Sequence, residues 1–240
     1  MAPGASSNAL IALLSIEERE KLLPDLEELD VEVRHEVFQA DVPIRHVYFP
    51  LSCVISIHSE MQDGIAVEIV AVGREGVVGL PVFLGGDQTP ATAFCQVPGR
   101  SLRMEANAFR AAVAVNPVLN TLLLRYTQAL LTHVSQSAAC NRVHPVEERC
   151  ARWLLTTHDS VGGESFELTQ EFLAEMLGVR RPRVSVAASI LQRAGFIRYS
   201  RGRVQVVDRA GLESAACECY GVITREYARL FALEEESDEH

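Results

Sequence analysis

The sequence lacks the features of several classes of protein. It has no run of about 18 apolar residues, so we expect no membrane-spanning helix and no membrane partner. Residues 1–8 carry no positively charged region before an apolar core, so we expect no signal peptide. No phosphate-binding loop, nucleophile elbow or zinc-protease motif occurs, so we do not expect an enzyme. These absences favour a cytoplasmic protein whose six cysteines are reduced.

The distribution of charge is more informative than its total. The 240 residues carry a net charge of −10, which by itself argues against a nucleic-acid partner. Between residues 168 and 209, however, eight arginines outnumber three acidic residues, and the segment has a net charge of +5. Contact with phosphates depends on such a local basic patch, so this segment is a candidate for binding DNA.

The first half of the chain has mainly the pattern of short strands. Residues 8–23 have apolar side chains at helical spacing, which predicts a helix. If Ser15 and Glu18 make a capping box, this segment forms two short helices instead. From about residue 29 to 104, short β-branched runs alternate with turn signals, including Asp63-Gly64 between two runs. Many short strands at this spacing predict a β-barrel or sandwich.

A long helix is expected after the strands. Asn116 is a good N-cap and Pro117 suits the first helical position, so the helix should run from Pro117 to about Asn141. Its apolar residues step by three and four, which favours a seam between two copies of the helix, although packing within one domain would give the same pattern. The predicted dimer seam comprises Leu119, Leu122, Tyr126, Ala129 and His133.

The most informative segment begins at Leu168. Thr169 can cap a first helix, Gly178 supplies a turn with positive φ, and a second helix begins at Arg181-Pro182. Gly195 ends that helix, and residues 196–207 have the pattern of a strand, a turn and a strand. This order predicts a winged helix-turn-helix, whose second helix enters the major groove of DNA.

Arginines open the second helix and lie along the wing. The planar guanidinium group pairs with guanine or with phosphate, and serine and threonine hydroxyls contact phosphates. A helical hairpin with a solvated arginine face is the simpler interpretation, but the ordered series of helix, turn, helix and hairpin favours DNA binding. The predicted DNA-binding residues are Thr169, Arg180, Arg181, Arg183, Ser185, Arg201 and Arg203.

The chain resembles the Crp/Fnr superfamily of bacterial regulators. The resemblance is strongest over residues 168–184 and 191–197, and residues 73–80 look like a loop of the family's sensory barrel. It implies an α+β fold with an N-terminal β-barrel of the cyclic-nucleotide-binding-like jelly-roll type, a long dimerisation helix and a C-terminal winged helix-turn-helix. It also implies a homodimer that binds a two-fold symmetric operator in double-stranded DNA, with RNA polymerase as a further partner.

The resemblance is incomplete at the start of the second helix. Arg181 matches the arginine that family members use there, but Pro182 stands where many have glutamate or serine, and Val186 where several have arginine. We therefore predict no operator sequence. The alternative function is that of an effector-binding sensor or scaffold dimer that has lost specific DNA binding.

These features divide the chain into four expected parts. A last amphipathic helix, from Asp208 to Leu233, is expected to pack on the winged helix. The parts are the N-terminal helix and sensory β-barrel (1–115), the dimerisation helix and hinge (116–144), the DNA-binding domain with its added C-terminal helix (145–233) and an acidic disordered tail (234–240).

The resemblance also allows a prediction about cyclic AMP as a ligand. Members that bind cyclic AMP have a glutamate directly after a barrel-loop glycine and an arginine further along the loop, whereas here Leu80 follows Gly79 and residues 88–93 contain no arginine. A buried phosphate without a cationic partner is costly, so we predict no cyclic AMP binding by that mode. A weak effector pocket for an unidentified ligand is expected at Gly79, Leu80, Thr92 and Tyr126, although the polar residues beside Tyr126 could instead set the helix register.

Cysteines and histidines give few signs of a cofactor. The family's oxygen sensors hold an iron–sulfur cluster on closely spaced N-terminal cysteines, whereas the first cysteine here is Cys53. Scattered cysteines could bind a metal or act as redox switches, but are more often small buried apolar residues, and single helix histidines are more often structural than ligands. We therefore predict no cofactor and no metal site, after weighing Cys140, Cys150, Cys217, Cys219, His133, His144 and His158.

Overall fold

Two antiparallel sheets form the N-terminal half of the molecule. The computed structural model describes residues 8–62 and 66–232, so the predicted turn at Asp63-Gly64, the first seven residues and the acidic tail lie outside the described residues. One sheet has the strand order β1-β7-β3 and the other β2-β6-β4-β5. The strands are β1 (Glu27–Val31), β2 (Glu36–Phe38), β3 (His46–Pro50), β4 (Val54–Glu60), β5 (Ala66–Val72), β6 (Thr92–Val97) and β7 (Gly99–Glu105).

The space between the two sheets is filled by apolar side chains. Val47, Ile55, Val72 and Met104 come from four different strands, and each is at most 1% exposed. They belong to one continuous core, because alternate residues of each strand point inward. The predicted β-barrel is thus confirmed, with an apolar interior.

Short helices flank the strands of the barrel along the chain. The N-terminal segment forms two helices, α1 (Ala9–Ala12) and α2 (Ile16–Leu22), followed by the 3₁₀ turn η1 (Leu23–Asp25). The capping box explains the break: the Ser15 hydroxyl accepts from the Glu18 N–H, and the Glu18 carboxylate accepts from the Ser15 N–H. Two further helices, α3 (Leu80–Phe83) and α4 (Ala106–Val115), lie on either side of strands β6 and β7 in the chain.

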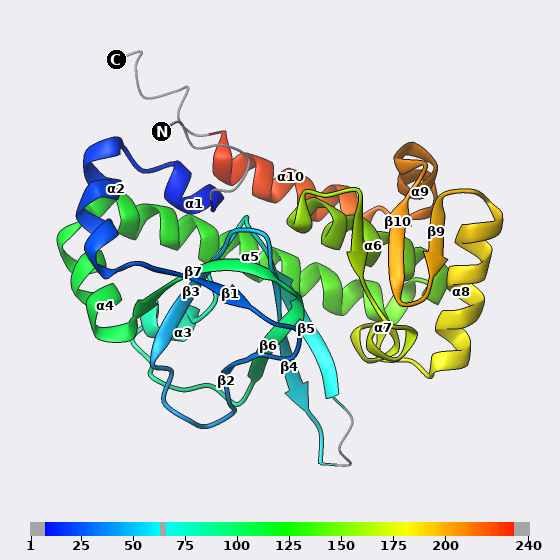
Figure 1. Ribbon diagram of the computed structural model, residues 1–240, viewed down its shortest axis with the longest axis horizontal. Coiled ribbons are helices and arrows are strands. Elements are labelled where there is room, and N and C mark those ends of the chain that lie inside the picture. Colours follow the sequence, from blue (N-terminus) through cyan, green and yellow to red (C-terminus); the bar gives the residue numbers. More distant parts are fainter. Residues whose placement is uncertain (1–7, 63–65, 233–240) are drawn as a thin grey trace.

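The long helix α5 (Pro117–Val143) connects the barrel to the C-terminal half (Figure 1). Its start is as predicted, because the Asn116 side chain accepts from the Leu119 N–H at 2.9 Å and Pro117 occupies the first turn. The helix ends at Val143, and the extended residues His144 and Pro145 lead into the next helix.

The structure revises the prediction of which α5 residues form a dimer seam. All five are buried inside the protomer, where they contact the barrel core or the C-terminal helix: Leu119, Leu122, Tyr126, Ala129 and His133. The Tyr126 hydroxyl, for example, donates to the Val77 carbonyl at 3.1 Å. Their heptad spacing reflects packing within one chain, which is the alternative that the pattern also allowed.

The C-terminal half is a winged helix-turn-helix. Gly178 has φ 61° and ends the first helix of the motif, as its predicted turn requires. A small antiparallel sheet of order β8-β10-β9 supplies the wing. The elements are α6 (Val146–Val161), β8 (Ser165–Glu167), α7 (Gln170–Leu177), α8 (Arg181–Arg193), β9 (Ile197–Ser200) and β10 (Arg203–Val206).

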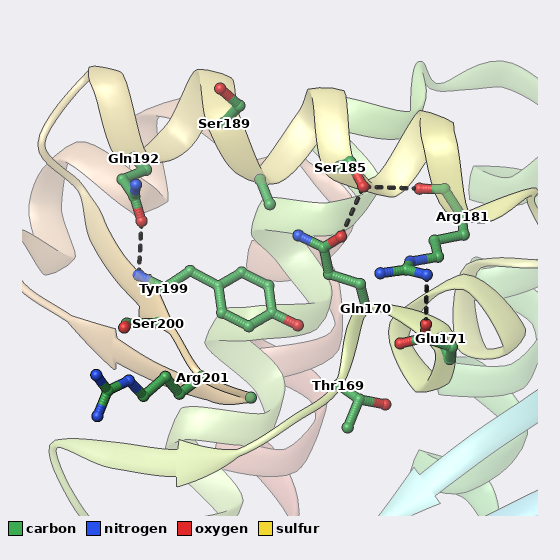
Figure 2. A pocket seen from close by; sticks show the side chains of 12 residues that line it. Thr169, Gln170, Glu171, Arg181, Ser185, Ser189, Gln192, Tyr199, Ser200 and Arg201 are labelled. Carbon is green, nitrogen blue, oxygen red and sulfur yellow. Dashed lines mark hydrogen bonds and ion pairs between the residues drawn. The ribbon is translucent and has the colours of Figure 1, made fainter.

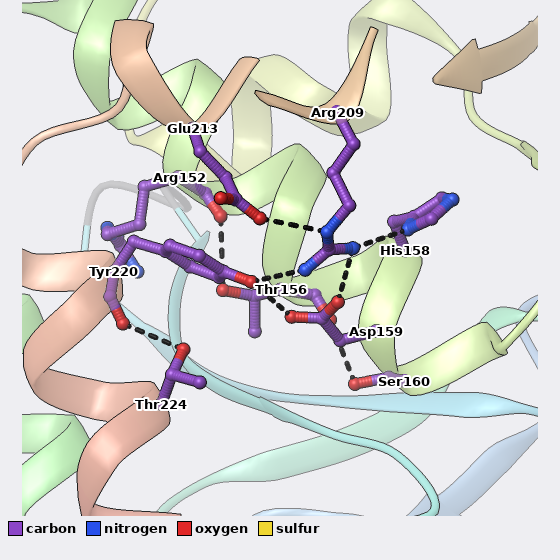
Figure 3. Close-up of polar contacts among 9 residues, drawn as sticks. All are labelled: Arg152, Thr156, His158, Asp159, Ser160, Arg209, Glu213, Tyr220 and Thr224. Carbon is purple, nitrogen blue, oxygen red and sulfur yellow. Dashed lines mark hydrogen bonds and ion pairs between the residues drawn. The ribbon is translucent and has the colours of Figure 1, made fainter. Parts of the chain in front are cut away.

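The expected last helix is two helices, α9 (Arg209–Ala215) and α10 (Cys219–Phe231), separated by an extended Ala216. The expectation that it packs on the winged helix holds in part. α9 packs on α6, whereas α10 lies along α5 and places Leu230 in the barrel-side core. Figure 3 shows the polar side chains that tie both helices to α6: Arg209 lies 2.7 Å from Asp159, and the Tyr220 hydroxyl donates to Asp159 at 2.8 Å.

The winged helix is docked on the barrel of its own chain. Phe172 of α7 meets Phe94 of β6 edge-on, with ring centroids 5.6 Å apart. The Trp153 indole of α6 donates to the Glu68 carboxylate of β5 at 2.9 Å, and Ser56 of β4 also donates to that carboxylate. A shared apolar cluster therefore includes Val54, Ala71 and Val97 of the barrel as well as the winged-helix core.

Candidate nucleic-acid interface

A groove runs between α7, α8 and the wing (Figure 2). Hydroxyl, amide and guanidinium groups line it. The lining residues are Thr169, Gln170, Glu171, Arg181, Ser185, Ala188, Ser189, Gln192, Tyr199, Ser200, Arg201 and Gly202.

Helix α8 is positioned by its apolar side. Val184, Ala187, Ala188 and Leu191 are at most 3% exposed and anchor the helix on the winged-helix core. The opposite side therefore faces solvent, and it begins with three exposed arginines at the N-terminal end: Arg180, Arg181 and Arg183. A helix end with this composition presents both the positive end of its dipole and guanidinium groups to an anion.

Arg181 forms an exposed ion pair with a neighbour on α7. Its guanidinium group lies 2.8 Å from the Glu171 carboxylate, and the two side chains are 62% and 55% exposed. An exposed ion pair of this kind contributes little to stability, so the arginine can exchange its partner for a base edge or a phosphate.

Two of the predicted DNA-binding residues make hydrogen bonds within the protein. The Thr169 hydroxyl accepts from the Phe172 N–H at 3.2 Å, which caps α7 as predicted. The Ser185 hydroxyl donates to Gln170 Oε1 at 2.6 Å and so links α8 to α7. Figure 2 shows this amide between the two helices. Gln170 is a site residue that the sequence reasoning missed, although its place directly after a helix cap was a signal for it.

The wing turns at Arg201 and Gly202, which have φ 50° and 76°. Two successive positive φ values make the tight hairpin turn that fits twisted strands, and they leave Arg201 and Arg203 exposed beside the groove. Tyr199, which the sequence reasoning also missed, fixes the wing to the connection between β8 and α7, because its hydroxyl donates to the Leu168 carbonyl at 2.9 Å.

Comparison with known proteins identifies both halves. Residues 29–116 match the profile of the cyclic nucleotide-binding domain family, and residues 148–215 match that of the Crp-like helix-turn-helix domain. The chain belongs to the Crp/Fnr family of transcription regulators. It is thus a DNA-binding regulator rather than an enzyme, and within residues 8–62 and 66–232 no helix is long and apolar enough to cross a membrane.

Relatives of this regulator span most of its length. It is 26% identical over 204 residues to a CRP-like cAMP-activated global transcriptional regulator of Mycobacterium tuberculosis, which covers 81% of this chain and 90% of the relative. Its fold is similar to that of FixK2 from Bradyrhizobium japonicum (TM-score 0.69, 17% identity, 80% of this chain and 98% of the other). The c-di-GMP responsive regulator CLP of Xanthomonas campestris is also similar (TM-score 0.64, 16% identity, 80% and 99%).

Of the four residues predicted for an effector pocket of this regulator, three lie around the loop that precedes α3, and the fourth does not. Gly79 has φ 102° and precedes Leu80, the first residue of α3, and Tyr126 packs against the preceding loop residues Gly76 and Val77. Burial raises the pKa of Tyr126, so its hydroxyl stays protonated. Thr92 is engaged elsewhere, because its hydroxyl accepts from the Ala40 N–H at the end of β2.

Helix α5 of the regulator also has an exposed face. Along it, exposed residues alternate in steps of three and four: Thr121, Leu124, Gln128, Leu131, Ser135 and Ala138. Leu124 and Leu131 lie one heptad apart and are 54% and 60% exposed. This second heptad series lies on the side of the helix away from the five buried residues, and it is free to meet another helix.

Proposed function

We propose that this regulator binds a two-fold symmetric operator as a homodimer, with α8 in the major groove and the wing on the backbone. The exposed arginines at the start of α8, beside an arginine-bearing wing, carry the proposal. A recognition helix reads base edges with its N-terminal side chains, which here include Arg181. Arg201 and Arg203 of the wing suit phosphates, which set affinity rather than sequence preference.

The dimer forms through the exposed heptad face of α5. Leu124 and Leu131 would meet their counterparts in a parallel pair of helices, and the polar Gln128 between them fixes the register. Such a pair places two copies of α8 on one side of the molecule, as a symmetric operator requires. In this assignment residues 1–115 form the sensory part, 116–144 the dimer helix and hinge, and 145–233 the DNA-binding part. RNA polymerase would be a further partner.

The effector is not cyclic AMP in the usual mode. The cyclic phosphate of that ligand needs a cationic partner, but residues 88–93 supply none, and Leu80 stands in place of an acidic residue after Gly79. The interior of the barrel is lined by apolar residues such as Val72 and Met104, where an unpaired anion would be costly.

Titration of DNA with point variants tests the proposal. The full chain first selects its preferred sites from a random pool, and fluorescence anisotropy then measures affinity for a selected site at several salt concentrations. Arg181→Ala should weaken binding by about 1–3 kcal/mol, roughly 5- to 150-fold, and relax base preference. Arg203→Ala should weaken binding to all sequences and reduce the salt slope by about 1.

The matched control is Arg45→Ala, an exposed arginine of the barrel, which should bind like the wild type. Equal binding by Arg181→Ala and the wild type would show that another group reads the bases. A chain that selects no DNA at any salt concentration would favour a sensor or scaffold that has lost DNA binding.

A further inference from the structure

Four side chains from two distant segments of the sequence meet where α5 ends and α10 begins. They are Cys140 in the last turn of α5, His144 in the hinge, Cys217 between α9 and α10, and Cys219 at the start of α10. Each offers one ligand atom, and these atoms all lie within 4.8 Å of one another. The sulfurs of Cys140 and Cys217 are 3.5 Å apart, and the Cys219 sulfur lies 3.5 Å from Nδ1 of His144.

These separations fit a tetrahedral metal ion. Zinc binds thiolate sulfur at about 2.3 Å and imidazole nitrogen at about 2.0–2.1 Å, so its ligand atoms are separated by about 3.5–3.8 Å. Three cysteines and one histidine form a complete ligand set of the structural type. The backbone arrangement also fits: Cys140 and His144 are four residues apart at the end of a helix, and Cys217 and Cys219 flank a single residue.

Neighbouring polar groups orient the ligands as in known zinc sites. The Nε2 atom of His144 lies 3.2 Å from the Glu218 carboxylate, which leaves Nδ1 directed at the thiols. A metal-bound histidine characteristically donates its other ring N–H to a carboxylate in this way. Gln136 of α5 donates to the Cys219 sulfur at 3.1 Å, which orients a second ligand.

The surrounding charge also suits a bound metal. Arg149 and Arg152 of α6 are 7% and 6% exposed, and their Nε atoms have no hydrogen-bond partner among the described residues. A zinc ion with three thiolates carries a net charge of −1, which these buried guanidinium groups would balance.

We propose that Cys140, His144, Cys217 and Cys219 bind one zinc ion. The ion clamps the start of α10 to the end of α5, directly beside the hinge at which the winged helix is attached. It therefore fixes the direction in which the DNA-binding domain leaves the dimer helix. The site revises the expectation that these cysteines are only small buried apolar residues.

Metal analysis of the purified full chain tests the site. Protein made in zinc-containing medium and purified under reducing conditions should hold about one zinc ion per chain. Cys217→Ser and Cys219→Ser should each lower bound zinc at least about tenfold, because a structural site needs four ligands. The control is Cys150→Ala, a buried cysteine in the winged-helix core, which should keep its zinc.

A second measurement keeps the test decisive if the serine variants fail to fold. Wild-type protein is stripped of metal with a chelator and reloaded with Co²⁺, which should give the strong visible absorption of tetrahedral cobalt and a thiolate charge-transfer band. A reduced, folded chain that holds neither zinc nor tetrahedral cobalt would overturn the proposal, as would a disulfide between Cys140 and Cys217 in freshly purified protein. Neither readout involves DNA, so failure here is distinct from failure of the proposed function.

Discussion

Replacing two leucines on the exposed face of α5 should separate the dimer into monomers that remain folded. Full burial of a leucine side chain contributes about 1.5–3 kcal/mol. Leu124 and Leu131 are 54% and 60% exposed, so each has slightly more than half of that energy left to gain from a partner. Four such side chains would meet in the proposed dimer, and their truncation should weaken association by roughly 3–7 kcal/mol, about 10²- to 10⁵-fold.

The assay is sedimentation equilibrium of the double variant Leu124→Ala/Leu131→Ala, with circular dichroism to show that the monomer stays folded. The matched control is Leu23→Ala/Leu84→Ala, because these leucines are 61% and 60% exposed but lie on η1 and at the end of α3. The control should associate like the wild type. If the α5 double variant associates as tightly as the control, the dimer uses another surface.

Three further predictions concern the buried carboxylate of Glu68, the ion pair of Arg181 and the binding of cyclic AMP. Burial raises the pKa of Glu68 above its usual 4.5, against the hydrogen bonds from Ser56 and Trp153 and the charge of Arg152. As the pH rises, Glu68 therefore loses its proton at a lower pH in the unfolded chain than in the folded chain. The free energy of unfolding falls as the pH rises from about 4.5 through the raised pKa. Glu68→Gln should remove that loss of stability. The loss is about 1.4 kcal/mol for each unit by which the pKa of Glu68 in the folded chain exceeds that in the unfolded chain. Urea unfolding across this pH range measures it, and an unchanged pH dependence would contradict the assignment. Glu171→Gln should free Arg181 and tighten DNA binding up to about fivefold in anisotropy titrations, and weaker binding would mean that the ion pair positions the arginine. Isothermal titration with cyclic AMP should give no heat of binding at micromolar concentrations, and a saturable signal would show that the barrel accommodates the phosphate by other residues.

Local signals predicted the elements of the site well. The winged helix was predictable because Thr169, Gly178 and Gly195 each mark a helix end by a known mechanism. The exposed arginines followed from the same pattern, since the apolar residues of α8 fix which side faces inward. The sequence could not show that Ser185 is engaged by Gln170, because that contact depends on how α7 and α8 cross.

The failures concern contacts between distant segments. Helix α5 carries two heptad series, and only the packed structure shows that the one with Tyr126 faces the barrel, whereas the one with Leu124 is exposed. The partner of α10 was not predictable either, because its apolar stripe fits any apolar surface. Cys140 and Cys217 are 77 residues apart, so their spacing gave no sign of a shared site.

The sequence logo of DNA selected from a random pool by the full chain tests the central claim most directly. Two copies of α8 on a symmetric dimer should select two inverted half-sites whose centres are about 10–10.5 base pairs, or roughly 34–36 Å, apart. Selection by Arg181→Ala should lose information at the same position of both half-sites. A selected pool with a single asymmetric site, or with no sequence preference, would contradict the account.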